Sequence, residues 1–314
     1  MSNNSQRLHV AVGVVRDGNG KILITRRAKH AHQGGLWEFP GGKLEAGEPV
    51  RQALARELAE EVGIQVKAAS PLIRINHDYG DRHVLLDVWN VTAFAGQARG
   101  CEGQAMRWID AEQLQEFSFP AANLPIIAAA QLPHYYAILE GKSAAEVLDN
   151  CRRILASGVK LLQFRVKSLP VAESQNLLEL VSQLCRQQQV RLLINAELPV
   201  NTTSAHGLHL SSRALLACAE RPKDYRWVAA SCHNLDELQR AETLGLDFAV
   251  LAPIQPTTSH PGAAALGWHA MTELLEQINL PVFALGGLGK QDLDRALAAG
   301  AQGIAGISAF LSDD

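Results

Sequence analysis

Several kinds of sequence signal are missing from this chain of 314 residues. It has no block of like charge, because its 29 basic residues are spread among 32 acidic ones, and this argues against binding of duplex DNA. Its first apolar run has only six residues, too few for a signal peptide core or a membrane span. Its five cysteines form no CxxC pair, which favours reduced thiols over disulfides or zinc. We therefore expect a cytoplasmic protein that binds no membrane.

No Gly/Ser-rich or Pro-rich linker divides the chain, and only a change in the order of predicted strands and helices marks a boundary. Residues 8–132 mix β-type runs with one strong helix, predicted over Pro49–Val62, which is typical of an α+β fold. From Pro133 on, short apolar strands alternate with amphipathic helices, which indicates βαβ units and a parallel sheet. The length also favours two domains, and we predict them over residues 1–132 and 133–314.

Eight strands are predicted in the second domain. They are YYAIL, LLQFRV, RLLINA, GLHLS, WVAASC, FAVLAP, VFALGG and GIAGIS. Eight strands with intervening helices favour a compact (β/α)8 TIM barrel over an open sheet. The sequence stops at Asp314, just after the eighth strand, so we expect the barrel to lack its last helix.

An acidic helix follows a glycine pair in the segment GGKLEAGEPVRQALARELAEEVGI. Residues Gly42–Ile64 of this segment contain seven fixed identities of a Nudix box, whose chance occurrence is on the order of 10⁻⁷. Glu57, Glu60 and Glu61, at spacing i, i+3, i+4, share one helix face and repel one another unless a cation joins them. The alternative is a solvated acidic face, which the complete box disfavours.

Oxygen ligands of this kind suit Mg²⁺ or Mn²⁺, and such a metal neutralises phosphate charge and lowers the pKa of a water. The segment therefore predicts metal-assisted hydrolysis of a phosphate anhydride. Arg56 points away from Glu57 and is placed to pair with Glu48, or it is an ordinary surface arginine. Gly41 and Gly42 allow a backbone carbonyl to approach the metal, or they form a simple tight turn.

Residues 8–130 resemble the MutT-like Nudix hydrolases, which clear 8-oxo-dGTP from the nucleotide pool. The likeness includes AVGVVRDGNGKILITRR, EFPGGKLEAGE, DRH at residues 81–83, EGQ at residues 102–104 and FPAANLPII. It implies Mg²⁺-dependent hydrolysis to the monophosphate and diphosphate, which prevents replication errors. It implies metal ligation by Gly41, Glu57, Glu60, Glu61 and Glu102. The implied catalytic residues are Glu57, Arg56 and Glu102, and the implied nucleoside triphosphate contacts are Arg27, His32, Phe39, Arg82 and Asn123.

The chemistry of the base agrees with these roles. Oxidised guanine carries a proton on N7, where guanine has an acceptor, so an Asn oxygen or a backbone carbonyl accepts from one base and repels the other. A buried polar reader of this kind discriminates by 10⁴ or more. Taken alone, Asn123 is more often a turn or helix-cap residue, and Arg27 a solvated charge at a strand end.

Residues 134–311 resemble the thiamine phosphate synthase and TenI family of barrels. The resemblance implies a thiazole phosphate-type ligand held by Gln163, Arg165, Lys167, Gly286, Gly287, Gly306 and Ser308, with the glycines after strands seven and eight as a backbone phosphate site. Ala196 and Ala214 stand where the synthases have two magnesium-binding aspartates, and His260 where they have a phosphate-binding lysine. This departure argues against synthesis of thiamine phosphate.

Three hypotheses follow. The first is an 8-oxo-dGTP diphosphatase with a diverged barrel. The second keeps the Nudix chemistry for thiamine-related diphosphates and couples it to thiazole tautomerisation by His233, which matches the TenI histidine and whose unperturbed pKa suits proton transfer. The third treats the barrel as a module for ligand binding or for homodimer formation, and His233 as a structural residue.

Overall fold

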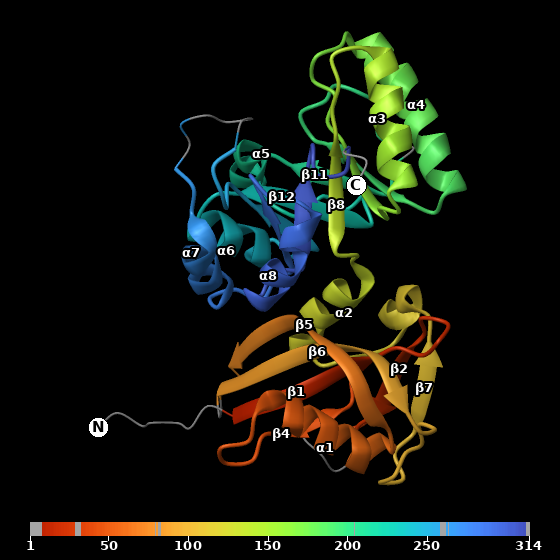
Figure 1. The fold of residues 1–314 in the computed structure, drawn as a ribbon, viewed down its shortest axis with the longest axis vertical. Helices are drawn as coiled ribbons and strands as arrows, with labels where there is room; N and C mark the ends of the chain where they lie inside the picture. The colour runs from red at the N-terminus through yellow and green to blue at the C-terminus, as the bar shows by residue number, and fades with distance from the viewer. Residues whose placement is uncertain are drawn as a thin grey trace. The chain divides into compact units, whose positions relative to one another are not determined.

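The computed structural model describes residues 8–28, 33–78, 80, 83–203, 205–257, 262 and 264–311. The predicted site residues His32 and Arg82 lie outside the described residues, as does His260. The chain divides into two compact units, Met1–Gln131 and Leu132–Asp314, and Figure 1 shows the fold of each.

The first unit contains two sheets. The larger has the order β4-β1-β6-β5, formed by Gly41–Lys43, Leu8–Val15, His83–Ala95 and Gln65–Asp78. The smaller has the order β3-β2-β7, formed by Trp37–Glu38, Ile22–Arg26 and Met106–Ile109. β1 runs parallel to β6 and antiparallel to β4, so the first strand joins the glycine turn to the centre of the sheet. The predicted α+β fold is confirmed.

Helix α1, Val50–Val62, begins one residue later than predicted because Pro49 is extended and stands at the N-cap position. It ends at Gly63, whose φ of 70° lies in the left-handed region that favours glycine. Its buried residues Ala53, Leu54, Leu58 and Val62 form one stripe of the helix. They pack in one cluster with Ala11 and Val15 of β1, which leaves the glutamates for the other side of the helix.

Strand β5 and helix α2 are among the elements of this unit that were not predicted. β5 carries Pro71 and three register irregularities, so its sequence lacks the alternation of a regular strand, and it lies at the edge of the sheet, where a proline is tolerated. Helix α2, Leu124–Gln131, follows the 3₁₀ turns η1, Ala111–Glu116, and η2, Ala121–Asn123. Its residues Ile126 and Ile127 close a core with Phe39.

The second unit is a closed barrel of eight parallel strands, as predicted. The strands are β8 Tyr135–Leu139, β9 Leu161–Phe164, β10 Arg191–Asn195, β11 Gly207–Leu210, β12 Trp227–Cys232, β13 Phe248–Leu251, β14 Val282–Leu285 and β15 Gly303–Gly306. Pairing of β15 with β8 closes the barrel. Tyr136, Phe248 and Phe283 fill its interior with mutual ring contacts of 5.3–5.7 Å.

The helices outside the barrel are α3 Ala144–Ala156, α4 Val171–Gln187, α5 Ser212–Ala217, α6 Leu235–Thr243, α7 Gly267–Leu275 and α8 Leu293–Ala298, with the 3₁₀ turn η3 Lys290–Asp292 before α8. The described residues between β10 and β11 contain no helix, so the expectation of a helix after every inner strand is wrong there.

The predicted absence of the last helix holds through Leu311. Beyond β15, Phe310 is buried and its ring meets Tyr135 edge-on at 5.5 Å. Arg153 of α3 donates to the carbonyl of Leu311. Ala309 and Leu311 pack against the same core as Phe310, so this short segment after β15 contributes to the packing around the barrel.

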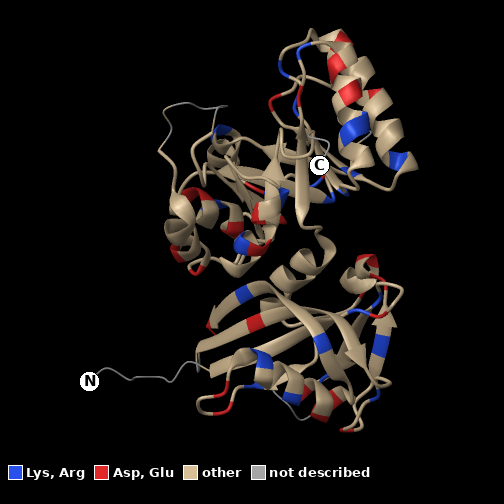
Figure 2. Cartoon of the chain, in the orientation of Figure 1, with Lys and Arg blue, Asp and Glu red and all other residues tan. Residues whose placement is uncertain are grey.

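In the view of Figure 2, acidic and basic residues are interspersed over both units, in keeping with the mixed charge of the sequence. Among the described residues, no helix is both long and apolar enough to span a membrane.

Candidate functional site

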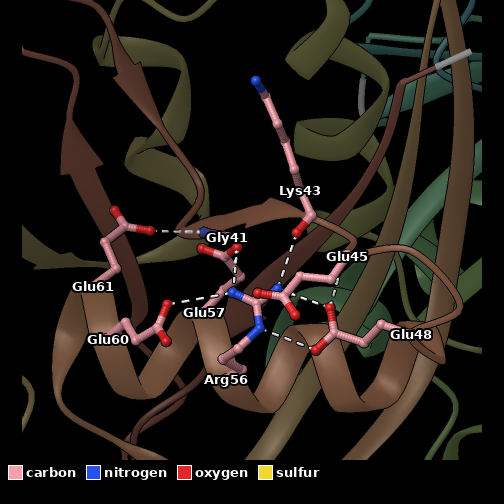
Figure 3. A network of polar contacts seen from close by, with 8 residues as sticks. All are labelled: Gly41, Lys43, Glu45, Glu48, Arg56, Glu57, Glu60 and Glu61. Atoms are coloured by element: carbon pink, nitrogen blue, oxygen red, sulfur yellow. Dashed lines mark hydrogen bonds and ion pairs between the residues drawn. The ribbon is translucent and has the colours of Figure 1, made fainter. Parts of the chain in front are cut away.

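A guanidinium group stands among the glutamates of α1, as Figure 3 shows. Arg56 Nη1 lies 2.8 Å from Glu57 Oε1 and 3.3 Å from Glu60 Oε2. Its Nε and Nη2 donate to the two oxygens of Glu48, and Nη2 also donates to the carbonyl of Lys43. The predicted pairing with Glu48 is confirmed. The expectation that Arg56 points away from Glu57 is wrong, because its long side chain brings Nη1 next to the carboxylates of both Glu57 and Glu60.

The pairing with Arg56 has electrostatic consequences. Hydrogen bonds from Arg56, followed by one from the backbone of Glu45, lower the pKa of Glu48. Glu45 N also lies 3.0 Å from Glu48 Oε2, so the loop before α1 is closed on itself and on the helix. Arg56 thus fixes the loop and two carboxylates at the same time.

The glycine pair leaves room for Glu57. A Cβ on Gly42 would come within 2.1 Å of Glu57 Oε2, so the carboxylate occupies the place where any other residue would carry a side chain. Gly41 has a φ of 149°, and a Cβ there would meet the carbonyl of Ala11 at 2.1 Å. Position 41 therefore requires glycine, whereas a side chain at position 42 would displace the Glu57 carboxylate, which rests against the backbone of β4.

Glu61 is turned toward the sheet. Its Oε2 accepts from Gly41 N at 2.9 Å and its Oε1 from the buried Thr25 Oγ1 at 3.2 Å. Burial raises the pKa of Glu61, these hydrogen bonds oppose the rise, and the charge of Glu102 adds to it. A buried carboxylate with a second acid in electrostatic range favours an added cation.

Glu38 is a site residue that the sequence did not reveal. It lies opposite Thr25 in the β2–β3 pair, and its carboxylate accepts a hydrogen bond from Arg27. Burial raises the pKa of Glu38 to about 7, against the effect of Arg27 and with a further increase from Glu61. The EFPGG segment contained the only signal, a glutamate directly before an apolar residue and the glycine turn.

Gln104, also unpredicted, positions the loop of Glu102. Its Nε2 donates to the carbonyl of Glu61 at 2.9 Å, and its Oε1 accepts from Glu102 N at the same distance. The side chain therefore ties the exposed Glu102 to the end of α1. The structure thus brings Glu102 into electrostatic range of Glu61.

The donor chemistry of this face fits a divalent cation, but the carboxylates are not assembled around one point. Among the described residues, no three His, Cys, Asp or Glu side chains form a group able to hold a metal. The reason is visible at Arg56, which holds Glu57 and Glu60, while Glu61 faces Thr25 and Gly41. All three carboxylates belong to the same helix, so a cation bound by all of them would have to draw Glu57 and Glu60 from the guanidinium.

The predicted base contacts lie beside a second aromatic residue. Phe39 is 4% exposed and stacks on Phe119 at 5.5 Å. Asn123, in η2, is 8% exposed, and no side-chain hydrogen bond joins it to another described residue. Its amide therefore has donors and an acceptor available for a ligand.

The barrel has a cavity of about 430 Å³ at the carboxyl ends of its strands. Gln163, Arg165, Lys167, Gly286 and His233 line it, whereas Gly287, Gly306 and Ser308 are not among its lining residues. Lining residues that were not predicted include Asn195, Glu197, Ser211, Arg213 and Ser231. They lie at or just after the carboxyl ends of β10, β11 and β12, and serine is too common a residue to stand out in a sequence.

A buried polar chain leads to this cavity. Gln163 Nε2 donates to Tyr136 Oη at 3.2 Å, Tyr136 Oη lies 3.0 Å from His209 Nδ1, and His209 Nε2 lies 2.9 Å from Ser231 Oγ. Burial lowers the pKa of His209 to about 3, so its ring is neutral. Because Tyr136 accepts from the amide, it donates to Nδ1, and Nε2 then carries the proton donated to Ser231.

Comparison with known proteins agrees with this geometry. A family model described as a NUDIX domain matches residues 11–129, and one described as thiamine monophosphate synthase matches residues 135–310. The chain belongs to both families. Its Nudix unit carries the acidic helix and its synthase-like unit carries the barrel cavity, and Nudix proteins typically depend on a divalent metal.

Three curated relatives illustrate the similarity. The 8-oxo-dGTP diphosphatase of Escherichia coli K12 is 44% identical over 123 residues, 39% of this chain and 95% of that protein. The CTP pyrophosphohydrolase of the same organism is 36% identical over 118 residues, 38% of this chain and 87% of that protein. The putative thiamine-phosphate synthase 2 of Aquifex aeolicus is 36% identical over 184 residues, 58% of this chain and 99% of that protein.

Proposed function

We propose that the Nudix unit hydrolyses 8-oxo-dGTP to the monophosphate and diphosphate with Mg²⁺ or Mn²⁺, and so removes an oxidised nucleotide before replication. The observation that carries the proposal is Asn123, which is 8% exposed, makes no side-chain hydrogen bond to another described residue, and follows Phe119, the ring stacked on Phe39. The hydrogen-bonding capacity of its amide is therefore available to a ligand. Its oxygen accepts from the N7 proton of the oxidised base and repels the N7 lone pair of guanine.

The acidic face supplies the phosphate chemistry in this proposal. Glu57, Glu60 and Glu61, with the carbonyl of Gly41 and with Glu102, would hold the metal. The metal, when bound, neutralises phosphate charge and lowers the pKa of a water. Arg56 keeps Glu57 and Glu60 in place. Arg27, paired with Glu38, is placed to exchange that carboxylate for a phosphate, and His32 and Arg82 are further proposed contacts.

The decisive measurement is a comparison of kcat/KM for 8-oxo-dGTP, dGTP, CTP and thiamine diphosphate, each with Mg²⁺. CTP is included because one relative is named for it, and thiamine diphosphate tests the alternative that the fusion serves thiamine-related substrates. We expect 8-oxo-dGTP to exceed dGTP by orders of magnitude. Equal values for these two nucleotides would show that oxidised guanine is not the selected base.

A pair of variants tests the metal face. Glu57→Gln removes a ligand charge with little change of shape, and we expect hydrolysis to fall at least 100-fold. The matched control is Glu116→Gln, an exposed glutamate of η1 outside the acidic face, which should leave hydrolysis unchanged. Unfolding midpoints of both variants establish that the fold is intact. Normal turnover by Glu57→Gln would remove the basis for the proposed metal site.

A second candidate function belongs to the barrel. His233 lines the cavity, and its Nδ1 lies 2.8 Å from the carbonyl of Ala252. A carbonyl only accepts, so Nδ1 carries the proton and Nε2 keeps a lone pair able to take a proton from a ligand. We infer from this arrangement a TenI-like tautomerisation of a thiazole phosphate.

The assay follows conversion of one tautomer of a thiazole phosphate to the other by the full chain. His233→Ala should abolish the enzymatic rate, and His269→Ala is the control because His269 is 91% exposed on α7 and pairs only with Glu273 at 3.3 Å among the described residues. An undiminished rate in His233→Ala would exclude this histidine as the base. No acceleration by the unmodified chain would leave the barrel as a binding or dimerisation module.

A further inference from the structure

The charges that face the barrel cavity do not balance. Arg165, Lys167 and Arg213 line it, and Glu197 is the one carboxylate among its described lining residues. Arg165 also pairs with Glu140, which is not a lining residue. Three positive side chains thus line the cavity, against Glu197 in the lining and Glu140 beside it, so an excess of positive charge remains, which attracts an anionic ligand.

The apolar part of the wall indicates the rest of the ligand. Ile138, Val250, Pro253 and Leu285 line the same cavity. A volume of about 430 Å³ is within the range of small-molecule sites. An anionic group joined to a small, largely apolar ring matches this combination, because an inorganic ion alone would make no contact with the apolar residues of the wall.

The wall does not fit a divalent metal. The two positions at which the family resemblance places magnesium-binding aspartates are Ala196 and Ala214, and alanine offers no ligand atom in its side chain. Glu197 already accepts from Lys167 Nζ at 2.6 Å, Ser211 Oγ at 2.8 Å and Arg213 Nη2 at 3.1 Å. The carboxylate of Glu197, which a metal would need as a ligand, is therefore already paired with the two cationic side chains Lys167 and Arg213.

We propose that this cavity binds the phosphate or diphosphate group of a small ligand directly on Lys167 and Arg213, without a divalent metal, and that Glu197 holds these two side chains until the ligand displaces it. The proposal concerns the barrel and is independent of hydrolysis in the Nudix unit. In this proposal, Arg213 provides the positive charge that a bound divalent metal would otherwise provide.

The properties of the three residues suit this exchange. Lys167 and Glu197 are 43% and 25% exposed, and Arg213 is 85% exposed, so these side chains are accessible to a ligand. Hydrogen bonds from Lys167 and then Ser211 lower the pKa of Glu197 to about 2, so the carboxylate stays ionised and the pairs persist at any ordinary pH. A phosphate with about two charges and three acceptor oxygens competes well against one carboxylate.

The displaced carboxylate has space to enter. A second cavity of about 350 Å³ is lined by the same Lys167, Glu197 and Arg213 and reaches Val171 and Ser174 of α4. The ion pairs of Glu197 with Lys167 and Arg213 thus border both cavities. When Lys167 and Arg213 bind an anion in the 430 Å³ cavity, the Glu197 carboxylate can move into the 350 Å³ cavity.

Calorimetric titration of the full chain with inorganic diphosphate, and separately with inorganic phosphate, tests the proposal. Each titration is run with EDTA and with Mg²⁺. We expect binding in EDTA with a Kd within about twofold of the value in Mg²⁺. Arg213→Ala should raise this Kd about tenfold or more, as expected for loss of a charge-assisted hydrogen bond. Glu197→Gln should lower it several-fold, because the competing charge is removed.

Lys223→Ala is the matched control. Lys223 forms an exposed pair with Glu220 at 2.8 Å and does not line the cavity, so the variant removes one positive charge from the same unit and should leave the Kd unchanged. Hydrogen exchange should show protection of residues 195–213 on binding, which separates this site from the Nudix unit.

Loss of barrel binding in EDTA would overturn the proposal, as would an Arg213→Ala affinity equal to that of Lys223→Ala. Weaker binding by Glu197→Gln would contradict the role of Glu197 as a placeholder. Hydrolysis by the Nudix unit, assayed on the same variants, should stay at the level of the unmodified chain. A failure of one proposal is thereby distinguishable from a failure of the other.

Discussion

Arg56 and Glu57 are neighbours in the sequence, and Arg56 Nη1 lies 2.8 Å from Glu57 Oε1. The same nitrogen is 3.3 Å from Glu60 Oε2, so the guanidinium places positive charge next to two of the three glutamates on this helix face. The arrangement offsets the mutual repulsion of the carboxylates without a metal. Under the proposed function, metal binding would therefore exchange one cation for another at Glu57 and Glu60.

Replacement of Arg56 by alanine should impair hydrolysis through the glutamates it positions. We expect kcat/KM at saturating Mg²⁺ to fall about 10–100-fold, as for other groups that orient metal ligands. Arg56→Lys should lose less activity than Arg56→Ala, because lysine keeps the positive charge. It should not reach full activity, because lysine lacks the planar guanidinium that bonds Glu48 and Glu57 at the same time. Titration of activity with Mg²⁺ should show an altered midpoint, which a purely structural defect would not produce.

Arg51→Ala is the control for this variant. Arg51 lies on the same helix, and its guanidinium lies 5.5 Å from the ring centre of Trp89. Its removal should leave both the rate and the Mg²⁺ midpoint near those of the unmodified chain. Full activity in Arg56→Ala would mean that the guanidinium is dispensable for the proposed metal ligands.

Glu38 should make the stability of the metal-free Nudix unit depend on pH. Its pKa is raised to about 7 in the folded unit from 4.5, so between these values the folded state keeps a proton that the unfolded chain has lost. The stabilisation is present below pH 4.5 and is lost as the pH rises through 7, and it amounts to up to about 3 kcal/mol. Denaturant unfolding in EDTA measures it.

Comparison with Glu38→Gln isolates this contribution. The amide does not titrate, so the difference in unfolding free energy between the two proteins should change across pH 4.5–7 and be flat outside it. A difference that stays constant across this window would show that Glu38 titrates normally.

The sequence was informative where a short segment determines both the structure and the chemistry. The Gly42–Ile64 segment predicted the helix and its acidic face, because these features depend on local spacing, whereas the close approach of Glu57 to Gly42 was not predicted. The eight barrel strands were equally clear from their apolar runs. Tertiary pairings were not predicted, such as that of Glu38 with Arg27, or that of Glu197, after β10, with Arg213 in α5. Nothing in the spacing of these residues brings them together.

Asn123→Ala should test base selection more than catalysis. If the amide oxygen accepts from the oxidised base, its loss should lower kcat/KM for 8-oxo-dGTP by about 10- to 100-fold and that for dGTP much less. The ratio of the two values is the informative quantity. Asn76→Ala, at a partly buried asparagine of β5, is a control for a general loss of order in the unit. An unchanged ratio in Asn123→Ala would remove this residue from the selection of the base.

His209 should make the barrel sensitive to acid. Burial lowers its pKa to about 3 from 6.5, so between these values the unfolded chain binds a proton that the folded barrel does not. The stabilisation is present above pH 6.5 and is lost as the pH falls through 3, with a total of up to about 5 kcal/mol. Urea unfolding monitored by hydrogen exchange in β11 reports on this unit separately.

The tautomer of His209 gives an independent test of the same chain. Donation from Tyr136 to Nδ1 requires the proton on Nε2, so nitrogen NMR shifts of the ring should show the Nε2–H form and no titration above pH 5. His209→Gln keeps a donor and an acceptor but does not titrate, so it should flatten the acid dependence of unfolding. A ring that titrates near pH 6.5 would contradict both the buried neutral state and the donated hydrogen bond to Ser231.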